Sequence, residues 1–333
     1  MADGYHAPLW LPGAHAQTLY APCVKPRGTV SYRRERWDTP DGDFVDLDWL
    51  DGPRDAPLVA MFHGLEGSSR SHYALALARE LSRRAWRGVF PHFRGCSGEP
   101  NRFARAYHSG DSAEADWILR RLRRESIGPL FAAGISLGGN VLLKWLGEHA
   151  AAAREVVQAV VCASVPLDLT VCGDWLGRGF NQIYTRHFLR SLKRKSLEKL
   201  QRHPGIFDRE AVIRARTLRQ FDDVVTAPLH GFRDTDDYWR RASSKPWLPR
   251  IAVPTLLISA RNDPFVPEWV LPKPGEVSAQ VTLYLPLQGG HAGFVAGPFP
   301  GHLDWLPRRL IGFCESALQP PPGAAQSGFC ARL

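Results

Sequence analysis

The first half of the chain alternates short apolar runs with amphipathic segments. The amphipathic segments between the runs, such as residues 112–125, carry apolar side chains at helical spacing. Strands that alternate with helices predict a mostly parallel sheet with helices on both faces. Residues 29–50, further upstream, predict two strands around the turn Pro40-Asp41-Gly42. The apolar runs read as buried strands at residues 57–62, 88–95, 130–135 and 156–165.

This alternation stops at Pro166 and returns only near residue 250. Residues 167–249 are rich in helical patterns and basic side chains and show no convincing strand, whereas 254–260 and 281–287 are again strand-like. The pattern predicts one α/β domain interrupted by an inserted helical cap. We expect an N-terminal extension with the first strands (1–54), a core (55–166 and 250–318), a cap (167–249) and a mobile Pro/Gly-rich tail (319–333).

Composition narrows the class of protein. With 333 residues, 44% of them hydrophobic, the chain is long enough for a large core, and its net charge is +9. A basic balance is compatible with nucleic acid or an anionic surface, but no basic run is interleaved with a nucleic-acid motif. The beginning of the chain lacks the pattern of a signal peptide, and no apolar run is long enough to span a membrane. The six scattered cysteines form no C-x-x-C, so reduced thiols in a cytoplasm are expected.

A G-x-S-x-G pattern occupies residues 134–138, "GISLG". It lies where a predicted buried strand ends and an amphipathic helix begins, which is the context of a nucleophile elbow. Small residues flank such a serine because a Cβ would clash in the sharp turn, and the helix N-terminus suits an oxyanion. Ser136 is therefore a candidate nucleophile.

A serine nucleophile needs a base and an acid that orients the base, and in this arrangement the chain order is serine, acid, histidine. Asp263 in "SARNDPFVP" and His291 in "QGGHAGFV" each follow a predicted strand, so both fall at the carboxyl edge of the sheet. Gly289 and Gly290 would let the backbone turn the imidazole toward the serine. The rival acids are Asp168 and Asp304, and the rival histidines are His63, read as packing under its loop, and His108.

The oxyanion donors are expected from two backbone positions. Leu137 follows the serine, and Leu65 lies in the loop "HGLEGSS" after the strand at 57–62. Gly64 and Gly67 allow close approach of that loop to a substrate. We assign no catalytic role to Glu66, which could be a solvated loop residue.

Taken together, these segments resemble the YheT-like family of α/β-hydrolase esterases, which is related to plant embryogenesis-associated proteins and mammalian abhydrolase-domain lipases. The resemblance covers residues 10 to 318. It implies a serine hydrolase of the carboxylesterase or lipase type, with the triad on Ser136, Asp263 and His291. The matching stretches are "LPGAHAQTL", "HGLEGSSRSHYA", "FRGCSGEPNR", "YHSGD", "GISLGGNVLLKWLGE", "FDDVVTAPLHGF", "DYWRRASS", "PTLLISARNDPFVP" and "GGHAGFV".

The predicted fold class is therefore an α/β-hydrolase with a helical cap, and the predicted chemistry is ester cleavage through an acyl-enzyme. Neither a metal nor an organic cofactor is required. The expected partner is a small-molecule or lipid ester, with no nucleic acid; the sequence does not indicate an oligomeric state. Two alternatives remain: an acyltransferase, in which an alcohol replaces water, and a non-catalytic basic binding module. A dehalogenase would need Asp in place of Ser136.

The cap carries most of the basic excess. Residues 186–219 contain eleven basic and three acidic residues. An apolar set, Phe180, Ile183, Tyr184, Phe188 and Leu192, recurs at helical spacing, and packing on the core is the expected role. A lipid-facing surface, with peripheral membrane contact, and an anionic ester substrate are the sharper alternatives. The pair Asp222-Asp223 predicts helix capping or cap–core hydrogen bonds rather than a metal site.

Overall fold

A single mixed sheet organises the molecule. The computed structural model describes residues 4–24 and 29–319. The strands lie side by side in the order β1-β2-β4-β3-β5-β6-β7-β8. Strand β2 is antiparallel to both of its neighbours, β1 and β4, and all other neighbouring strands are parallel. The strands are β1 (Arg33–Asp38), β2 (Phe44–Leu50), β3 (Leu58–Phe62), β4 (Arg87–Pro91), β5 (Leu130–Ile135), β6 (Val160–Ala163), β7 (Thr255–Ile258) and β8 (Val281–Tyr284).

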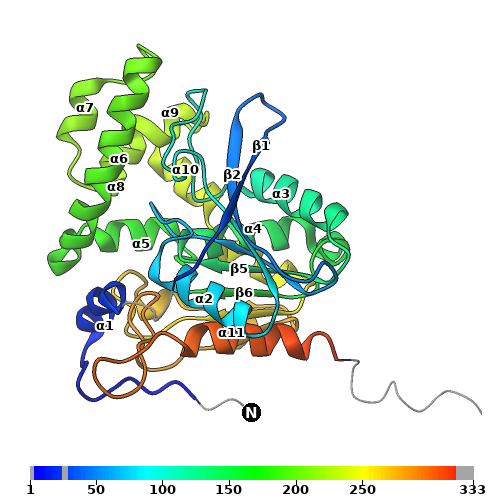
Figure 1. The fold of residues 1–333 in the computed structure, drawn as a ribbon. Helices are drawn as coiled ribbons and strands as arrows, with labels where there is room; N and C mark the ends of the chain where they lie inside the picture. Colours follow the sequence, from blue (N-terminus) through cyan, green and yellow to red (C-terminus); the bar gives the residue numbers. More distant parts are fainter. Residues whose placement is uncertain (1–3, 25–28, 320–333) are drawn as a thin grey trace, which may run out of the picture.

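Helices cover both faces of this sheet, as the alternating pattern predicts (Figure 1). α2 (His72–Arg83) and α11 (Trp305–Ser316) pack against each other on one face, and α3 (Ser112–Glu125) and α4 (Leu137–His149) on the other. Strands β3, β5 and β6 are buried along their whole length, because apolar side chains on both faces meet a helical layer. The core is therefore split by the sheet into two large apolar clusters.

Between β6 and β7, the described chain contains helices and no strand. Most of these helices form a layer of their own, seen at the left and upper left of Figure 1, whereas the last of them packs on α4. The domain boundaries drawn from the sequence remain a proposal, and nearly all of the expected tail, from residue 320 on, lies outside the described residues. The helices are α5 (Leu169–Leu176), the 3-10 helix η3 (Gly179–Asn181), α6 (Gln182–Arg202), α7 (Arg209–Arg214), α8 (Leu218–Phe221), the π-helix η4 (Asp222–Thr226), α9 (Ala227–Leu229), α10 (Thr235–Ala242) and the 3-10 helix η5 (Lys245–Arg250).

The apolar set expected on the cap helix has two environments. Tyr184 is buried and Phe188 packs against Phe265, so these positions join the core as expected. Phe180 and Ile183 are 52% and 44% exposed and do not. Across residues 4–24 and 29–319, no helix combines the length and the apolar character needed to cross a membrane.

One short helix lies outside this scheme. α1 (Ala14–Tyr20) precedes the sheet in the chain, yet its polar side chains contact the loops that follow β7 and β8. This contact between the two ends of the chain shapes the site described next.

Candidate active site

Ser136 occupies the sharp turn between β5 and α4. Its backbone has φ +53°, a left-handed conformation that a non-glycine residue rarely adopts. A Cβ at Gly134 would lie 2.6 Å from the Cα of Gly139, and a Cβ at Gly138 would lie 2.6 Å from the carbonyl oxygen of His63. The two motif glycines are therefore required by backbone contacts, as the elbow hypothesis expects.

The three residues singled out from the sequence meet at the carboxyl edge of the sheet. His291 Nε2 lies 3.0 Å from Ser136 Oγ. On the other side of the ring, His291 Nδ1 lies 2.9 Å from Asp263 Oδ2 and 3.1 Å from Oδ1. Each imidazole nitrogen thus faces one partner, which is the geometry of a serine, its base and the acid that orients the base.

Neighbouring groups hold the Asp263 and His291 side chains in place. The Asp263 side chain is fully buried, and its Oδ1 accepts a 2.8 Å hydrogen bond from the backbone N–H of Phe265. The Phe265 ring stacks on the His291 imidazole with centroids 3.9 Å apart. The imidazole therefore has one face covered and one ring nitrogen held by a carboxylate, while its Nε2 is left for the serine.

Helix α1 holds the loop that carries His291. Thr18 Oγ1 accepts a 2.9 Å hydrogen bond from the His291 N–H. Gln17 is completely buried, and its Oε1 accepts from the Gly289 N–H and from Asn262 Nδ2, both at 3.0 Å. Sequence reasoning missed these residues; the one signal was the stretch "LPGAHAQTL", which took part in the family resemblance without a role.

The two expected oxyanion donors lie beside the serine. A Cβ built on Gly64 would be 3.2 Å from the Ser136 Cβ, so the loop that carries Leu65 passes the serine at a distance that leaves little room for a side chain at position 64. Leu137 is the first residue of α4. Neither the Leu65 N–H nor the Leu137 N–H donates a hydrogen bond to another residue in the described part of the chain. Both are therefore available to a substrate oxygen.

The rival residues have structural partners elsewhere. Asp168 caps α5 by accepting from the Val171 N–H at 3.1 Å, and the Asp304 carboxylate, at the start of α11, lies 3.5 Å from the Arg308 guanidinium. His63 is buried, and burial lowers the pKa of its imidazole to about 3. Its Nδ1 donates to the Gly64 carbonyl at 2.8 Å, and its Nε2 accepts from the Phe93 N–H. His63 thus supports the loop from below, as expected.

The rival His108 is half-buried and lines the same cavity as Ser136, but its ring contacts other residues. Its ring packs on His230 with centroids 4.5 Å apart, and its Nδ1 accepts from the Gly110 N–H at 3.2 Å. Burial lowers the pKa of His108 to about 4, so its imidazole is neutral at physiological pH.

Glu66 is not a solvated loop residue. It adopts φ +56°, and its side chain is only 8% exposed. Its Oε1 accepts from Tyr107 Oη at 2.8 Å and from Lys195 Nζ at 3.0 Å. Lys195 belongs to α6, so this ion pair ties the loop of Leu65 to the cap. Lys195 Nζ also lies 3.5 Å from Cys96 Sγ, and burial raises the pKa of that thiol to about 12.

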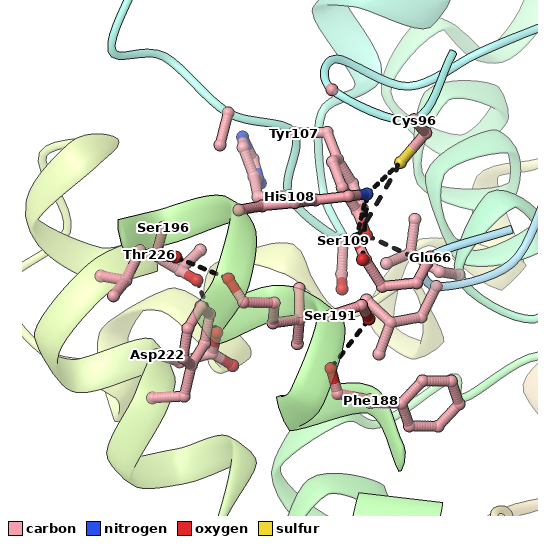
Figure 2. A pocket seen from close by; sticks show the side chains of 18 of the residues that line it. Glu66, Cys96, Tyr107, His108, Ser109, Phe188, Ser191, Ser196, Asp222 and Thr226 are labelled. Carbon is pink, nitrogen blue, oxygen red and sulfur yellow. Dashed lines mark hydrogen bonds and ion pairs between the residues drawn. The ribbon is translucent and has the colours of Figure 1, made fainter. Parts of the chain in front are cut away.

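A cavity of about 620 Å³ opens beside Ser136 and His291, between the core and the cap. Figure 2 shows Glu66, Tyr107 and Cys96 converging on one side of it and Asp222, Thr226 and Ser196 on another. The wall formed by α5, α8 and η4 is mostly apolar. The lining residues of that wall include Leu169, Leu176, Leu218, Phe221 and Val225.

The acidic pair of the cap makes hydrogen bonds within the cap. Asp222 accepts from Thr226 Oγ1 at 2.6 Å and from Trp239 Nε1 at 2.8 Å, and Asp223 accepts from the N–H and hydroxyl of Thr235. Burial raises the pKa of Asp222 to about 6. Within residues 4–24 and 29–319, no cluster of three or more His, Cys, Asp or Glu side chains could hold a metal ion.

Comparison with known proteins shows the class of protein to which the chain belongs. The sequence model described as the alpha/beta hydrolase fold matches residues 57–298. Among solved structures, an esterase from Exiguobacterium antarcticum superposes with a TM-score of 0.53 over 87% of this chain and 100% of that chain, at 17% identity. At that identity the likeness shows the fold alone.

Two relatives place the chain more narrowly. YheT of Escherichia coli (strain K12), whose name describes an esterase, is 41% identical over 92% of this chain and 91% of its own length. Phospholipase ABHD3 of Mus musculus is 28% identical over 96% of this chain and 80% of its own length. The chain belongs to the YheT-like family of α/β hydrolases, as its motifs predict.

Proposed function

We propose that this carboxylic ester hydrolase cleaves its substrate in two steps through an acyl-enzyme on Ser136. The observation that carries the proposal is the chain of contacts from Ser136 Oγ to His291 Nε2, at 3.0 Å, and from His291 Nδ1 to Asp263, at 2.9 Å. A hydroxyl alone is a poor nucleophile, and a base within hydrogen-bond distance supplies the activation it needs.

In the first step, His291 takes the proton of Ser136 as Oγ attacks the ester carbonyl. Asp263 keeps the Nδ1 proton in place and stabilises the imidazolium. The N–H groups of Leu65 and Leu137 hold the oxygen that becomes negative, and the N-terminus of α4 adds its dipole. Collapse of the tetrahedral intermediate breaks the ester C–O bond, and His291 returns the proton to the leaving alcohol.

In the second step, water attacks the acyl-enzyme. His291 takes a proton from the water, and the same two N–H groups stabilise the second tetrahedral intermediate. The bond to Ser136 Oγ then breaks, and His291 returns the proton to the serine. The products are the free acid and the regenerated enzyme, so the cycle consumes one water and needs no cofactor.

The cavity supports an ester with an apolar acyl chain. Leu169, Leu176 and Phe221 lie on its apolar wall, and burial of a hydrocarbon chain there is favourable by about 0.8 kcal/mol for each CH₂ group. The name of ABHD3 describes a phospholipase, and that relative is consistent with a lipid ester. We also propose a cytoplasmic location, which the scattered free cysteines support.

A series of p-nitrophenyl esters of increasing acyl length tests this proposal. Wild type should hydrolyse at least one ester, and Ser136→Ala and His291→Ala should each lose at least about 10³-fold in kcat. Asp263→Asn should lose about 10⁴-fold, because the amide favours the wrong imidazole tautomer. The matched control is Asp168→Asn, which removes the charge of a helix cap and should keep most of the activity. A dead Asp168→Asn beside a fully active Asp263→Asn would refute the acid assignment.

A further inference from the structure

One face of α6 lines the cavity along most of its length. Phe188, at the start of this face, packs against Phe265, whose ring stacks on His291. The face therefore begins beside the catalytic base with apolar side chains and becomes cationic toward the end of the helix. Its members recur every three or four positions, as one helical stripe: Phe188, Ser191, Leu192, Lys195, Ser196, Lys199 and Arg202, with His203 following.

Of the residues in this stripe, Lys195 contacts the loop that carries Leu65. Its Nζ is 3.0 Å from Oε1 of Glu66, the residue after Leu65. Measured along the helix axis from Lys195, Lys199 lies about 6 Å away, which is one turn, and Arg202 lies about 10 Å away. A group bound between Lys199 and Arg202 is therefore one to two turns away from the level at which Leu65 would hold the ester carbonyl.

The other cations that face the cavity have carboxylate partners. Lys195 pairs with Glu66 at 2.9 Å, and Arg94 pairs with Glu114 at 2.5 Å. Arg194 lies 4.0 Å from Glu198. These three positive charges are balanced within the protein, so they need no charge from a ligand.

Lys199 and Arg202 have no such balance. Lys199 Nζ donates to the carbonyl oxygens of Phe103, at 3.0 Å, and Arg105, at 3.3 Å, which leaves one of its three hydrogens unused. Burial lowers the pKa of the Lys199 ammonium; Arg94 and Arg202 add to this effect, and Asp43 opposes it. The Arg202 guanidinium makes no hydrogen bond or ion pair with any residue of the described ranges.

His203 provides an independent sign of a missing partner. Its side chain lines the same cavity, and its Nε2 is buried without a hydrogen-bond partner among residues 4–24 and 29–319. A buried polar nitrogen without a partner is unfavourable, and such atoms are uncommon in native proteins. That nitrogen is enclosed in the structure, so the imidazole ring has to turn toward the cavity before a ligand oxygen can accept from it.

We propose that Lys199, Arg202 and His203 form a subsite for an oxyanion, a phosphate or a carboxylate, carried by the alcohol part of the ester substrate. Guanidinium and ammonium groups bind phosphate and carboxylate through charge-assisted hydrogen bonds. The apolar wall of α5, α8 and η4 accepts the acyl chain, so the charged end lies on the alcohol side of the ester. This inference rests on the proposed ester hydrolysis and names the substrate class as an acyl ester of an anionic alcohol.

A matched pair of esters tests the subsite. 1-Octanoylglycerol and 1-octanoylglycerol 3-phosphate share the acyl chain and glycerol and differ by the phosphate. We expect kcat/KM of wild type to favour the phosphate ester by at least about tenfold, and Lys199→Met and Arg202→Met each to reduce that preference by about tenfold, the usual effect of losing a hydrogen bond to a charged group. The control Arg190→Met removes an exposed cation of the same helix that does not face the cavity, and it should keep the preference.

Four outcomes would overturn the subsite or its role. A wild-type preference of one or less, or a preference that survives the double variant Lys199→Met/Arg202→Met, would overturn the subsite while ester hydrolysis stands. If wild type turns over neither ester, calorimetry with Ser136→Ala separates the two claims. Tighter binding of the phosphate ester would support the subsite and count against hydrolysis, whereas equal binding would overturn the subsite. Inorganic phosphate that binds as tightly as the phosphate ester would indicate a site for the free anion and overturn the substrate role.

Discussion

The Thr18 hydroxyl accepts a 2.9 Å hydrogen bond from the backbone N–H of His291, although 273 residues separate the two in the chain. The same hydroxyl donates to the Ala14 carbonyl at 2.8 Å, so its orientation is fixed by its own helix. Helix α1 thereby helps to position the loop after β8 that carries His291, the proposed base, from outside the sheet.

Replacement of Thr18 by Val keeps the shape of the side chain and removes the acceptor. We expect kcat for a p-nitrophenyl ester to fall about tenfold with little change in KM, because a displaced base affects the chemical step and an unmade buried hydrogen bond is unfavourable by about 1–3 kcal/mol. Thr18→Ser keeps the hydroxyl and should restore kcat to near the wild-type value. A Thr18→Val enzyme with kcat within twofold of wild type would show that this contact does not position His291.

The glycine at 138 should not tolerate a methyl group. A Cβ there would meet the carbonyl oxygens of Phe62 and His63, which are backbone atoms of the core and cannot move aside easily. We expect Gly138→Ala to lower the free energy of unfolding by at least about 1–3 kcal/mol, as overpacking does, and to lower kcat by displacing the elbow.

Gly312 in α11 is the matched control for this substitution, because a Cβ built there meets nothing within 4 Å. Gly312→Ala should raise the free energy of unfolding by about 0.5–1 kcal/mol, since alanine is the better helix former. Urea unfolding measures both variants. Equal stability of Gly138→Ala and Gly312→Ala would contradict the steric account of the motif.

Asp222 should make stability depend on pH. Burial, with a smaller contribution from Asp223, raises its pKa from 3.8 to about 6, against the hydrogen bonds from Thr226 and Trp239. A raised acid pKa means that the folded state holds the proton more tightly. Asp222 therefore makes its full favourable contribution to the free energy of unfolding below about pH 4. This contribution is lost as the pH rises through about 6, and the total loss is about 3 kcal/mol.

Asp222→Asn removes this titration and keeps one oxygen that can accept from Trp239, while its amide group can donate to the Thr226 hydroxyl in place of the bond that Thr226 donates in wild type. We expect the free energy of unfolding of Asp222→Asn, relative to wild type, to increase by about 1–2 kcal/mol between about pH 5 and about pH 7.5. Urea unfolding at the two pH values measures this difference. A difference that stays constant, or that decreases with pH, would show that Asp222 is already ionised in the folded protein.

The sheet and its helices could be predicted because their signals are local. Period-two and period-3.6 patterns, together with the position of Pro166, predict the order of strands and helices, and the strand ends then bring Ser136, Asp263 and His291 to one edge. Their distances in the structure are consistent with that prediction, whereas their catalytic roles remain to be measured.

What could not be predicted depends on contacts between distant parts of the chain. Gln17 and Thr18 lie in a helix of seven residues with no amphipathic pattern, so nothing local indicates that they reach His291. Lys195 and Glu66 are 129 positions apart, and from sequence Lys195 was one cation among eleven in residues 186–219. Such pairs are set by how the cap and α1 pack on the core, and a single sequence carries no periodic signal for that packing.

Labelling with a fluorophosphonate, read by intact-mass spectrometry and peptide mapping, tests the central claim most directly. The reagent phosphonylates a serine only when a neighbouring base activates it. Our account predicts one adduct per chain on Ser136, abolished in Ser136→Ala and strongly slowed in His291→Ala. A wild-type protein that forms no adduct, or an adduct that persists unchanged in Ser136→Ala, would contradict the assignment of Ser136 as the nucleophile.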